Sequence, residues 1–190
     1  MWNEKQMLDY IKINLKESRF RHSLSVSDTG VLLAKRYHQN IEKAHIAGLV
    51  HDCAKNLTDA QLIKVVNNHK IEISDIEIQN PSILHGLVAS IIAKEEMGIN
   101  DEDILMSIRY HTTGRKNMST LEKIIYIADY IEPLREFSGV EELRNLTQID
   151  LDAAILKSFD NTIKYVISKS GLLHMDTIDA RNYLLSKDRR

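Results

Sequence analysis

Cysteine is nearly absent from this sequence, since Cys53 is the only one among 190 residues. An intrachain disulfide is therefore excluded, and so is a zinc site built from several cysteines. Long apolar runs are also missing, because no stretch approaches the ~20 residues that span a bilayer. The N-terminal residues are mixed polar and acidic, unlike a signal peptide. We therefore expect a cytoplasmic protein with no membrane partner.

Proline and glycine are scarce, with two and seven residues respectively. So few turn-forming residues disfavour an all-β chain with many turns. Hydrophobic residues make up 43% and charged residues 27% of the chain, which is ordinary for a globular protein. The formal net charge of −2 disfavours a surface that neutralises many phosphates, so we expect no nucleic-acid polymer as a partner.

Apolar residues recur at intervals of three and four along most of the chain, which predicts an all-α helical array. We expect one domain over residues 1–190, with a motif-bearing core at about 18–135 and C-terminal helices at about 150–187. The predicted helices lie at about 7–15, 20–38, 41–55, 59–69, 81–97, 101–111, 120–132, 150–168 and from 176 onwards. The alternating isoleucines at 71–78 permit an extended segment, and 137–144 is predicted to be irregular.

Five polar positions, counting the adjacent His51 and Asp52 as one, interrupt apolar stripes that should face the core. His22 shares a helix face with Val26 and Leu33, and Asp129 extends the stripe of Leu121 and Ile125. The others are the His51-Asp52 pair, His85 and His111. A lone histidine on an apolar face is more often a hydrogen-bonded core residue than a ligand. Several such groups together are different, because each buried group without a partner costs about 1–3 kcal/mol. They are expected to satisfy one another or a cation.

The adjacent His51 and Asp52 are the strongest ligand candidates. Neighbours on a helix diverge by about 100°, so both reach one metal only if it lies beside the helix. Imidazole nitrogen and carboxylate oxygen together suit iron, manganese or another first-row ion. With His22 and Asp129 added, the sequence predicts a metal site between the core helices. His85 and His111 would then bind a second metal or face phosphate groups.

These positions form a recognisable pattern. The order His22, His51-Asp52, Asp129 resembles the H…HD…D signature of the HD-domain metal-dependent phosphohydrolases, and adding His85 and His111 matches the bimetal variant. The segments 19–22, 48–55, 85–86, 111–114 and 128–135 are similar to the bacterial YqeK-type family, over about residues 7–185. The resemblance implies an HD domain that cuts diadenosine tetraphosphate symmetrically, releasing two ADP.

Residue chemistry and the resemblance together assign roles. His22, His51, Asp52 and Asp129 would hold iron, or manganese or another divalent ion, which would activate a water. A second ion would use His85 and His111, so one or two ions are expected. Lys55 is placed with these catalytic residues. Substrate phosphates would be bound by Arg19, Lys55, His85, His111, Thr112, Arg115 and Arg135.

Several alternatives stay open at this stage. An HD-type nucleotidase or phosphodiesterase acting on another small nucleotide would use the same ligands. Histidine and carboxylate ligands on helices also suit di-iron oxygen chemistry, although the nearby cations favour phosphate. A non-catalytic module that binds metal and nucleotide is the non-enzymatic alternative. Apolar residues on the terminal helices make a homodimer plausible. No motif specifies adenine over guanine.

Overall fold

The computed structural model describes residues 1–187, and within this range it contains helices and no strand. The all-α prediction is therefore confirmed. The helices are α1 (Glu4–Asn14), α2 (Glu17–Arg36), α3 (Ile41–Val50), α4 (Asp59–Asn68), α5 (Asp75–Gln79), the 3₁₀ helix η1 (Pro81–Leu84), α6 (His85–Glu95), α7 (Glu102–Arg109), α8 (Thr120–Ile131), α9 (Val140–Ile149), α10 (Leu151–Ser168) and α11 (Met175–Lys187).

Side-chain caps fix most helix starts. Capping boxes satisfy the first free backbone N–H groups of four helices. They pair Asn3 with Gln6, Thr58 with Gln61, Ser74 with Glu77, and Ser119 with Glu122. Asn40 and Asp150 cap α3 and α10 with their side chains alone. The predicted helix starts at about 41, 59, 120 and 150 therefore lie within one residue of the observed starts.

Several predicted boundaries are wrong, and local chemistry explains them. The segment 71–78 is not extended throughout, because the Ser74 capping box starts α5 there. The proline at position 81 opens a 3₁₀ turn rather than an α-helix, and α6 begins only at His85. Asp101 caps α7, which begins at Glu102, one residue later than predicted. The segment predicted to be irregular includes the start of α9, whose N-cap is Gly139 in the left-handed region at φ 91°.

Two helices end earlier than predicted, which changes how the candidate ligands are presented. α3 ends at Val50, and residues 51–56 form turns. α7 ends at Arg109, so His111 also lies in the turn that follows its helix. His51 and Asp52 therefore project from a turn rather than from neighbouring positions of one helix. In a helix, adjacent side chains diverge by a fixed angle of about 100°, whereas in a turn this angle can vary.

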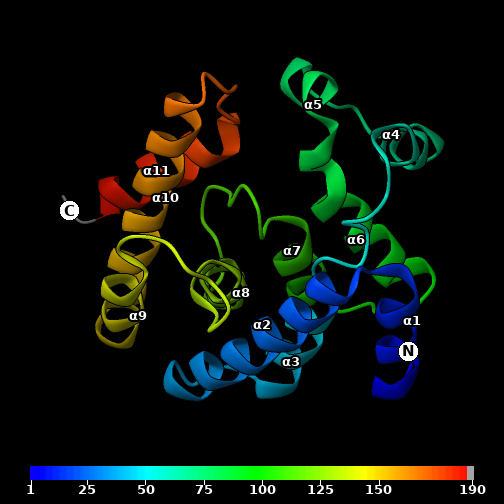
Figure 1. Ribbon diagram of the computed structural model, residues 1–190, viewed down its shortest axis with the longest axis horizontal. Coiled ribbons are helices and arrows are strands. Elements are labelled where there is room, and N and C mark those ends of the chain that lie inside the picture. Colours follow the sequence, from blue (N-terminus) through cyan, green and yellow to red (C-terminus); the bar gives the residue numbers. More distant parts are fainter. Residues whose placement is uncertain (188–190) are drawn as a thin grey trace.

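Helix α8 lies in the middle of the molecule (Figure 1). It contacts α2 and α3 on one side, α7 on another, and α9 and α10 on a third (Figure 1). One hydrophobic cluster of buried side chains extends from Met7 in α1 to Leu184 in α11. Among the helices of residues 1–187, none has the length and hydropathy that crossing a membrane requires.

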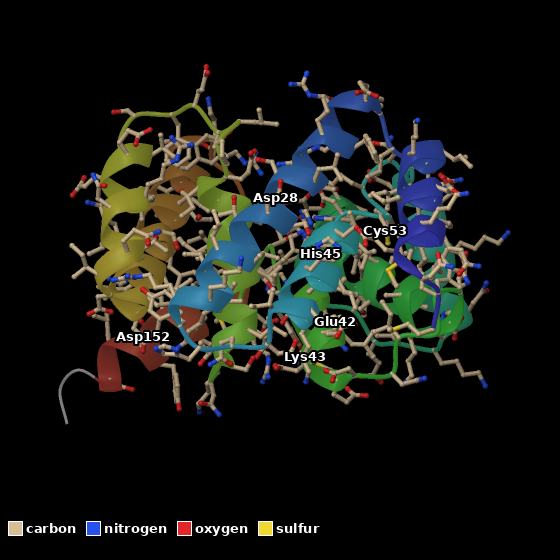
Figure 2. All side chains as sticks on the ribbon, turned by 90° about the horizontal axis from the view of Figure 1, so that it is seen from below. Asp28, Glu42, Lys43, His45, Cys53 and Asp152 are labelled. Carbon is tan, nitrogen blue, oxygen red and sulfur yellow. The ribbon has the colours of Figure 1, made fainter. Side chains whose placement is uncertain are left out.

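Two glycines let helix backbones approach closely where the histidines gather. Helices α2 and α3 run side by side (Figure 2). A Cβ added at Gly48 of α3 would lie 2.7 Å from the Ser27 Cα of α2. A Cβ added at Gly86 of α6 would lie 2.6 Å from the carbonyl oxygen of Arg109. Any larger residue would push these helices apart.

Candidate metal centre

Four of the predicted ligands meet beside α8. His22 comes from α2, His51 and Asp52 from the turn after α3, and Asp129 from α8. His22 Nε2 lies 2.9 Å from Asp129 Oδ1 and 4.0 Å from Asp52 Oδ2. His51 Nε2 lies 3.7 Å from Asp52 Oδ2 and 4.0 Å from Asp129 Oδ1. Two imidazole nitrogens thus face two carboxylates across a small space.

The other two predicted histidines lie against the opposite oxygen of Asp52. His85 Nε2 is 3.2 Å and His111 Nε2 is 3.4 Å from Asp52 Oδ1. The two Nε2 atoms are 3.0 Å apart. Asp52 therefore stands between two pairs of histidines, and each of its carboxylate oxygens faces one pair. All four rings are buried.

The Nδ1 atom of each of these histidines is hydrogen-bonded to an oxygen that has no proton to donate and can act only as an acceptor. For His51 it is the Gly48 carbonyl at 2.7 Å, and for His22 the Glu132 carboxylate at 3.0 Å. The carbonyls of Ser82 and Ile108 serve His85 and His111, at 2.6 and 2.7 Å. Each Nδ1 must carry the proton, so each neutral ring presents the lone pair of Nε2 to the cluster. Metal-binding histidines are oriented in the same way.

This donor set fits a divalent cation. Two groups, His22–His51–Asp129 and His51–Asp52–His111, each have ligand atoms within 4.8 Å of one another. The Nε2 atom of His51 is buried without a hydrogen-bond partner among the described residues, and that of His22 is buried against Asp129 Oδ1 at 2.9 Å. A buried nitrogen without a partner, such as His51 Nε2, is costly unless something binds it. Nitrogen and carboxylate donors together match first-row divalent metals.

Electrostatics keep the carboxylates charged and one imidazole neutral. Burial lowers the pKa of His51 to about 4. Burial alone would raise the pKa of Asp52, but His51, His111 and His85 outweigh it and hold that pKa well below its usual range. The pKa of Asp129 is also strongly lowered, since His22 and the Arg135 charge overcome burial. Deprotonated ligands are what a metal requires.

Cationic side chains border the cluster. Arg19 Nη1 lies 3.1 Å from Asp52 Oδ2, and Arg135 Nη2 lies 2.6 Å from Asp129 Oδ1. Lys55 Nζ is 3.1 Å from His85 Nε2, and burial lowers the pKa of this ammonium. The Thr112 hydroxyl is 3.2 Å from the same nitrogen. The structure thus brings all these predicted residues to the cluster.

Arg115 is placed elsewhere. Its Nε and Nη2 donate to the two oxygens of the buried Glu122, at 2.6 and 2.9 Å, and its guanidinium lies 5.4 Å from the Tyr110 ring centre. It lines a small cavity with Ala180 and Leu184 of α11. These contacts give Arg115 a structural role in anchoring the loop before α8.

Sequence reasoning assigned no role to Glu132 or Arg21. Glu132 is 1% exposed, and its carboxylate accepts hydrogen bonds from His22 Nδ1 and, at 2.7 Å, from the Leu134 backbone N–H. Its spacing of three after Asp129 was a signal, because a second acid on that helix end falls on nearly the same face. Arg21 lines a pocket of about 380 Å³ with Arg19, Arg135 and His22. Only the three-dimensional arrangement reveals this cationic pocket.

Comparison with known proteins places the chain in a family. The HD domain model matches residues 19–134. The chain is 41% identical over 183 residues to the symmetrical bis(5'-nucleosyl)-tetraphosphatase of Halalkalibacterium halodurans, covering 96% of this chain and 97% of the relative. It is 38% identical over 184 residues to the protein of the same name from Bacillus subtilis, covering 97% and 98%.

A solved structure agrees with the fold. The crystal structure of a predicted HD superfamily hydrolase involved in NAD metabolism from Clostridium acetobutylicum has a TM-score of 0.97 and 57% sequence identity. The match covers 98% of this chain and 99% of that one. The match of the HD model, the paired histidine and aspartate at its centre, and full-length similarity agree: this chain belongs to the HD-domain family, together with the symmetrical bis(5'-nucleosyl)-tetraphosphatases.

Proposed function

We propose that this chain hydrolyses diadenosine tetraphosphate at the middle of its bridge, releasing two ADP. The observation that carries the proposal is the pair of buried Nε2 atoms, on His22 and His51, that face two carboxylates beside a cationic pocket. This arrangement suits a metal that binds phosphate, and it occurs in a chain 41% identical to a symmetrical tetraphosphatase.

The metal ligands in this proposal are His22, His51, Asp52 and Asp129. A divalent ion held by these residues would supply Lewis-acid chemistry and lower the pKa of a bound water towards 7. Iron is our choice among first-row ions, because imidazole and carboxylate donors are mixed in one site. His85 and His111 are the proposed ligands of a second ion. Their Nε2 atoms and Asp52 Oδ1 lie 3.0 to 3.4 Å from one another. A bound cation would remove the repulsion between the lone pairs of these three atoms.

The chain's own cations would hold the tetraphosphate. Arg19 and Arg135 are each 34% exposed, so their guanidinium groups can reach phosphate oxygens without leaving the site. Both line the pocket that Arg21 also borders. Guanidinium groups bind phosphate through two parallel hydrogen bonds, which fixes orientation as well as charge. Phosphoryl transfer depends mainly on such positioning and charge neutralisation.

Lys55 and Thr112 would act on the far side of Asp52. Both can donate a hydrogen bond to His85 Nε2, at 3.1 and 3.2 Å. If His85 and His111 bind no second ion, these donors would bind phosphate oxygens or supply a proton to the leaving group. The two versions differ in metal content, which elemental analysis of the purified protein measures directly.

The deciding experiment is to incubate the metal-loaded protein with diadenosine tetraphosphate and to identify the products by anion-exchange chromatography. ADP as the only product supports the proposal. ATP with AMP would contradict symmetric cleavage, and an unchanged substrate would contradict the activity itself. Control substrates are AMP, an acyclic phosphodiester and NAD, which test the nucleotidase, phosphodiesterase and NAD-related alternatives. Turnover without oxygen, with a redox-inert divalent ion, separates hydrolysis from oxygen chemistry.

Location and assembly complete the proposal. We assign the protein to the cytoplasm, with no nucleic-acid polymer as partner, and we propose that it forms a homodimer through its C-terminal helices. Exposed apolar side chains at Ile167, Leu172 and Met175 support that surface. Sedimentation velocity over a range of concentrations tests it, and a concentration-independent monomer would contradict it.

A further inference from the structure

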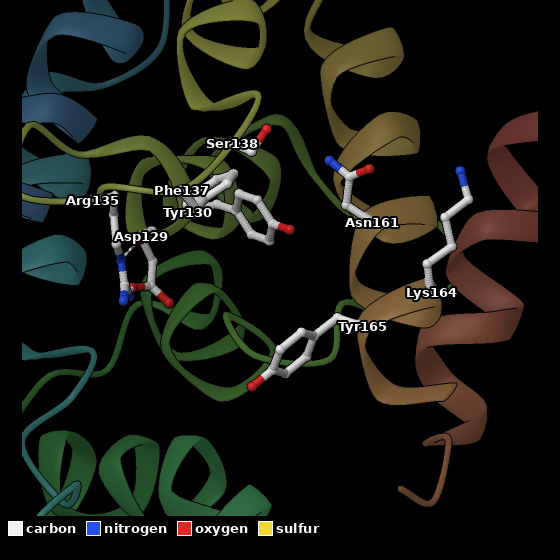
Figure 3. A pocket seen from close by; sticks show the side chains of 8 residues that line it. All are labelled: Asp129, Tyr130, Arg135, Phe137, Ser138, Asn161, Lys164 and Tyr165. Carbon is white, nitrogen blue, oxygen red and sulfur yellow. Dashed lines mark hydrogen bonds and ion pairs between the residues drawn. The ribbon is translucent and has the colours of Figure 1, made fainter. Parts of the chain in front are cut away.

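Within the described residues 1–187, helix α11 contributes no residue to the two cavities beside the metal centre. The larger cavity, of about 660 Å³, lies between the end of α8, the segment that follows it, and α10 (Figure 3). The cationic pocket is lined from α2 and from that same segment. Helix α11 packs against α10 and lies outside residues 19–134, which the HD model matches. Any effect of α11 on the site therefore passes through a neighbouring segment.

The loop 112–117 is such a segment, because it begins inside the cluster. The Thr112 hydroxyl is 3.2 Å from His85 Nε2. The loop then leaves the cluster with two residues in the left-handed region, Gly114 at φ 65° and Asn117 at φ 57°. Since no helix or strand ladder fixes this backbone, its position depends on contacts with neighbouring elements.

Helices α10 and α11 make these contacts. The hydroxyl of Thr177, in the first turn of α11, donates a hydrogen bond to the Thr113 carbonyl at 2.8 Å. Thr177 is buried, at 5% exposed. Phe159 of α10 packs directly on the backbone of Gly114, where an added Cβ would lie 2.6 Å from the ring. The two residues that follow Thr112 are thus held from two helices.

The rest of α11 continues along the same loop. The Tyr183 hydroxyl donates a hydrogen bond to Asn117 Oδ1 at 2.8 Å. Ala180 and Leu184 are buried and line a small cavity with Met118. Positions 177, 180 and 184 are three and four residues apart, so they share one face of the helix. The buried face of α11 therefore lies against the loop and the residues that join it to α8.

The hydrogen bond from Thr177 acts on the residue next to Thr112. If the buried Thr113 carbonyl lost its donor, it would be unsatisfied, and the segment would shift towards another partner. A shift of about 1 Å in a binding group is enough to weaken its contact with a bound molecule. The position of the Thr112 hydroxyl therefore depends on the C-terminal helix.

We propose, resting on the function proposed above, that α11 positions the loop 112–117 and that Thr177 is a positioning residue for Thr112. The Thr177 hydroxyl holds the Thr113 carbonyl, and this fixes the Thr112 hydroxyl where it donates a hydrogen bond to a phosphate oxygen of the substrate. Thr177 itself lines neither cavity, so it acts only through the loop.

The test compares Thr177→Val and Thr177→Ala, which both lack the hydroxyl, with Thr177→Ser, which keeps it. Thr147→Val is the matched control, since Thr147 is also buried and its hydroxyl donates to the Leu143 carbonyl within α9. Calorimetry at a constant free Mn²⁺ concentration measures the affinity for ADP. We expect Thr177→Val and Thr177→Ala to weaken ADP binding about fivefold, whereas Thr177→Ser and Thr147→Val should match the wild type.

The same substitutions are then made in a Thr112→Ala protein. Because the hydroxyl that Thr177 positions is absent there, Thr177→Val should cause no further loss of ADP affinity. A purely structural role predicts the same loss with and without Thr112, and that result would overturn the proposal. So would unchanged ADP affinity in Thr177→Val, or a loss that Thr177→Ser does not restore.

This readout is a binding constant, so it separates the positioning role from the proposed activity. If ADP affinity depends on Thr177 through Thr112 in a protein that does not cleave diadenosine tetraphosphate, the activity is refuted and the positioning role stands. Normal cleavage by Thr177→Val, with ADP affinity equal to that of the wild type, would refute the positioning role alone.

Discussion

Glu132 orients the ring of His22, because its Oε1 accepts a hydrogen bond from His22 Nδ1 at 3.0 Å. The opposite nitrogen of the ring then points into the metal centre, 2.9 Å from Asp129 Oδ1. The carboxylate is itself fixed by the Leu134 backbone N–H, and it is 1% exposed. A buried anion behind an imidazole makes the ring a stronger base and sets its tautomer. Glu132 is thus a positioning residue for the proposed ligand His22.

Replacing Glu132 by glutamine should weaken metal binding by about 10–100-fold, because the negative charge behind His22 is lost while the side-chain shape is kept. Calorimetric titration with Mn²⁺ measures this change, and circular dichroism checks that the helices persist. Glu136→Gln is the matched control, since Glu136 is a nearby exposed acid. Equal Mn²⁺ affinity in the two variants would show that Glu132 does not act through His22.

His51 and His45 provide a second matched pair, because both histidines belong to the α3 region and only one reaches the cluster. His45 contacts Ser27 at 2.8 Å and Glu4 at 3.2 Å. His51→Ala removes a proposed ligand, so it should lower the metal affinity by more than the roughly 10–100-fold expected when a residue that only orients a ligand is removed. Activity should be lost as well. His45→Ala should retain both.

The measurement is the melting temperature with and without Mn²⁺, alongside turnover. A metal that binds only the folded state raises the melting temperature, so the wild type and His45→Ala should both gain stability. His51→Ala should gain little. Full turnover or a normal metal-induced gain in His51→Ala would contradict the ligand assignment.

Alanine substitutions at Gly48 and Gly30 distinguish the effect of the close α2–α3 contact from the effect of helix propensity. A methyl group at Gly48 would meet the Ser27 backbone at 2.7 Å, whereas one at Gly30 would meet Ile125 Cδ1 at an ordinary 3.4 Å. Gly48→Ala should therefore lower the free energy of unfolding by about 1–3 kcal/mol and reduce metal affinity, because α2 carries His22 and α3 leads to His51. Gly30→Ala should raise the free energy of unfolding by about 0.4 to 1 kcal/mol. Urea unfolding of both variants tests this, and similar midpoints would rule out the tight α2–α3 contact.

The apolar periodicity and the capping residues predict which segments are helical, and the interruptions at His22 and Asp129 predict two of the groups that meet. The ends of α3 and α7 were not predictable, because the apolar pattern continues through Ala54 and up to His111. Their true ends depend on tertiary contacts that draw the following turns inward. The spacing of Glu132 after Asp129 is a local signal, but its contact with His22 depends on which helices are neighbours, and a local pattern does not encode this.

The depressed pKa of His51 predicts a pH dependence for the metal-free protein. Burial is the main cause, and of the facing groups Asp52 and Asp129 raise the pKa while His111 and His22 lower it, to about 4 overall. In the unfolded chain the value is about 6.5, so between these pH values the unfolded state binds a proton that the folded state does not. The stability that neutral His51 contributes is therefore complete above pH 6.5 and is lost as the pH falls towards 4. Between pH 7 and pH 5 the loss should be on the order of 2 kcal/mol.

Urea unfolding of chelator-treated protein at these two pH values measures the loss. The comparison with His51→Asn isolates this residue, since His85 and His22 titrate in both proteins and asparagine does not titrate. His51→Asn should lose less stability on acidification than the wild type, by about 1–2 kcal/mol. An identical pH dependence in His51→Asn and the wild type would mean that His51 binds a proton equally well in the folded metal-free protein and in the unfolded chain, which would contradict its lowered pKa.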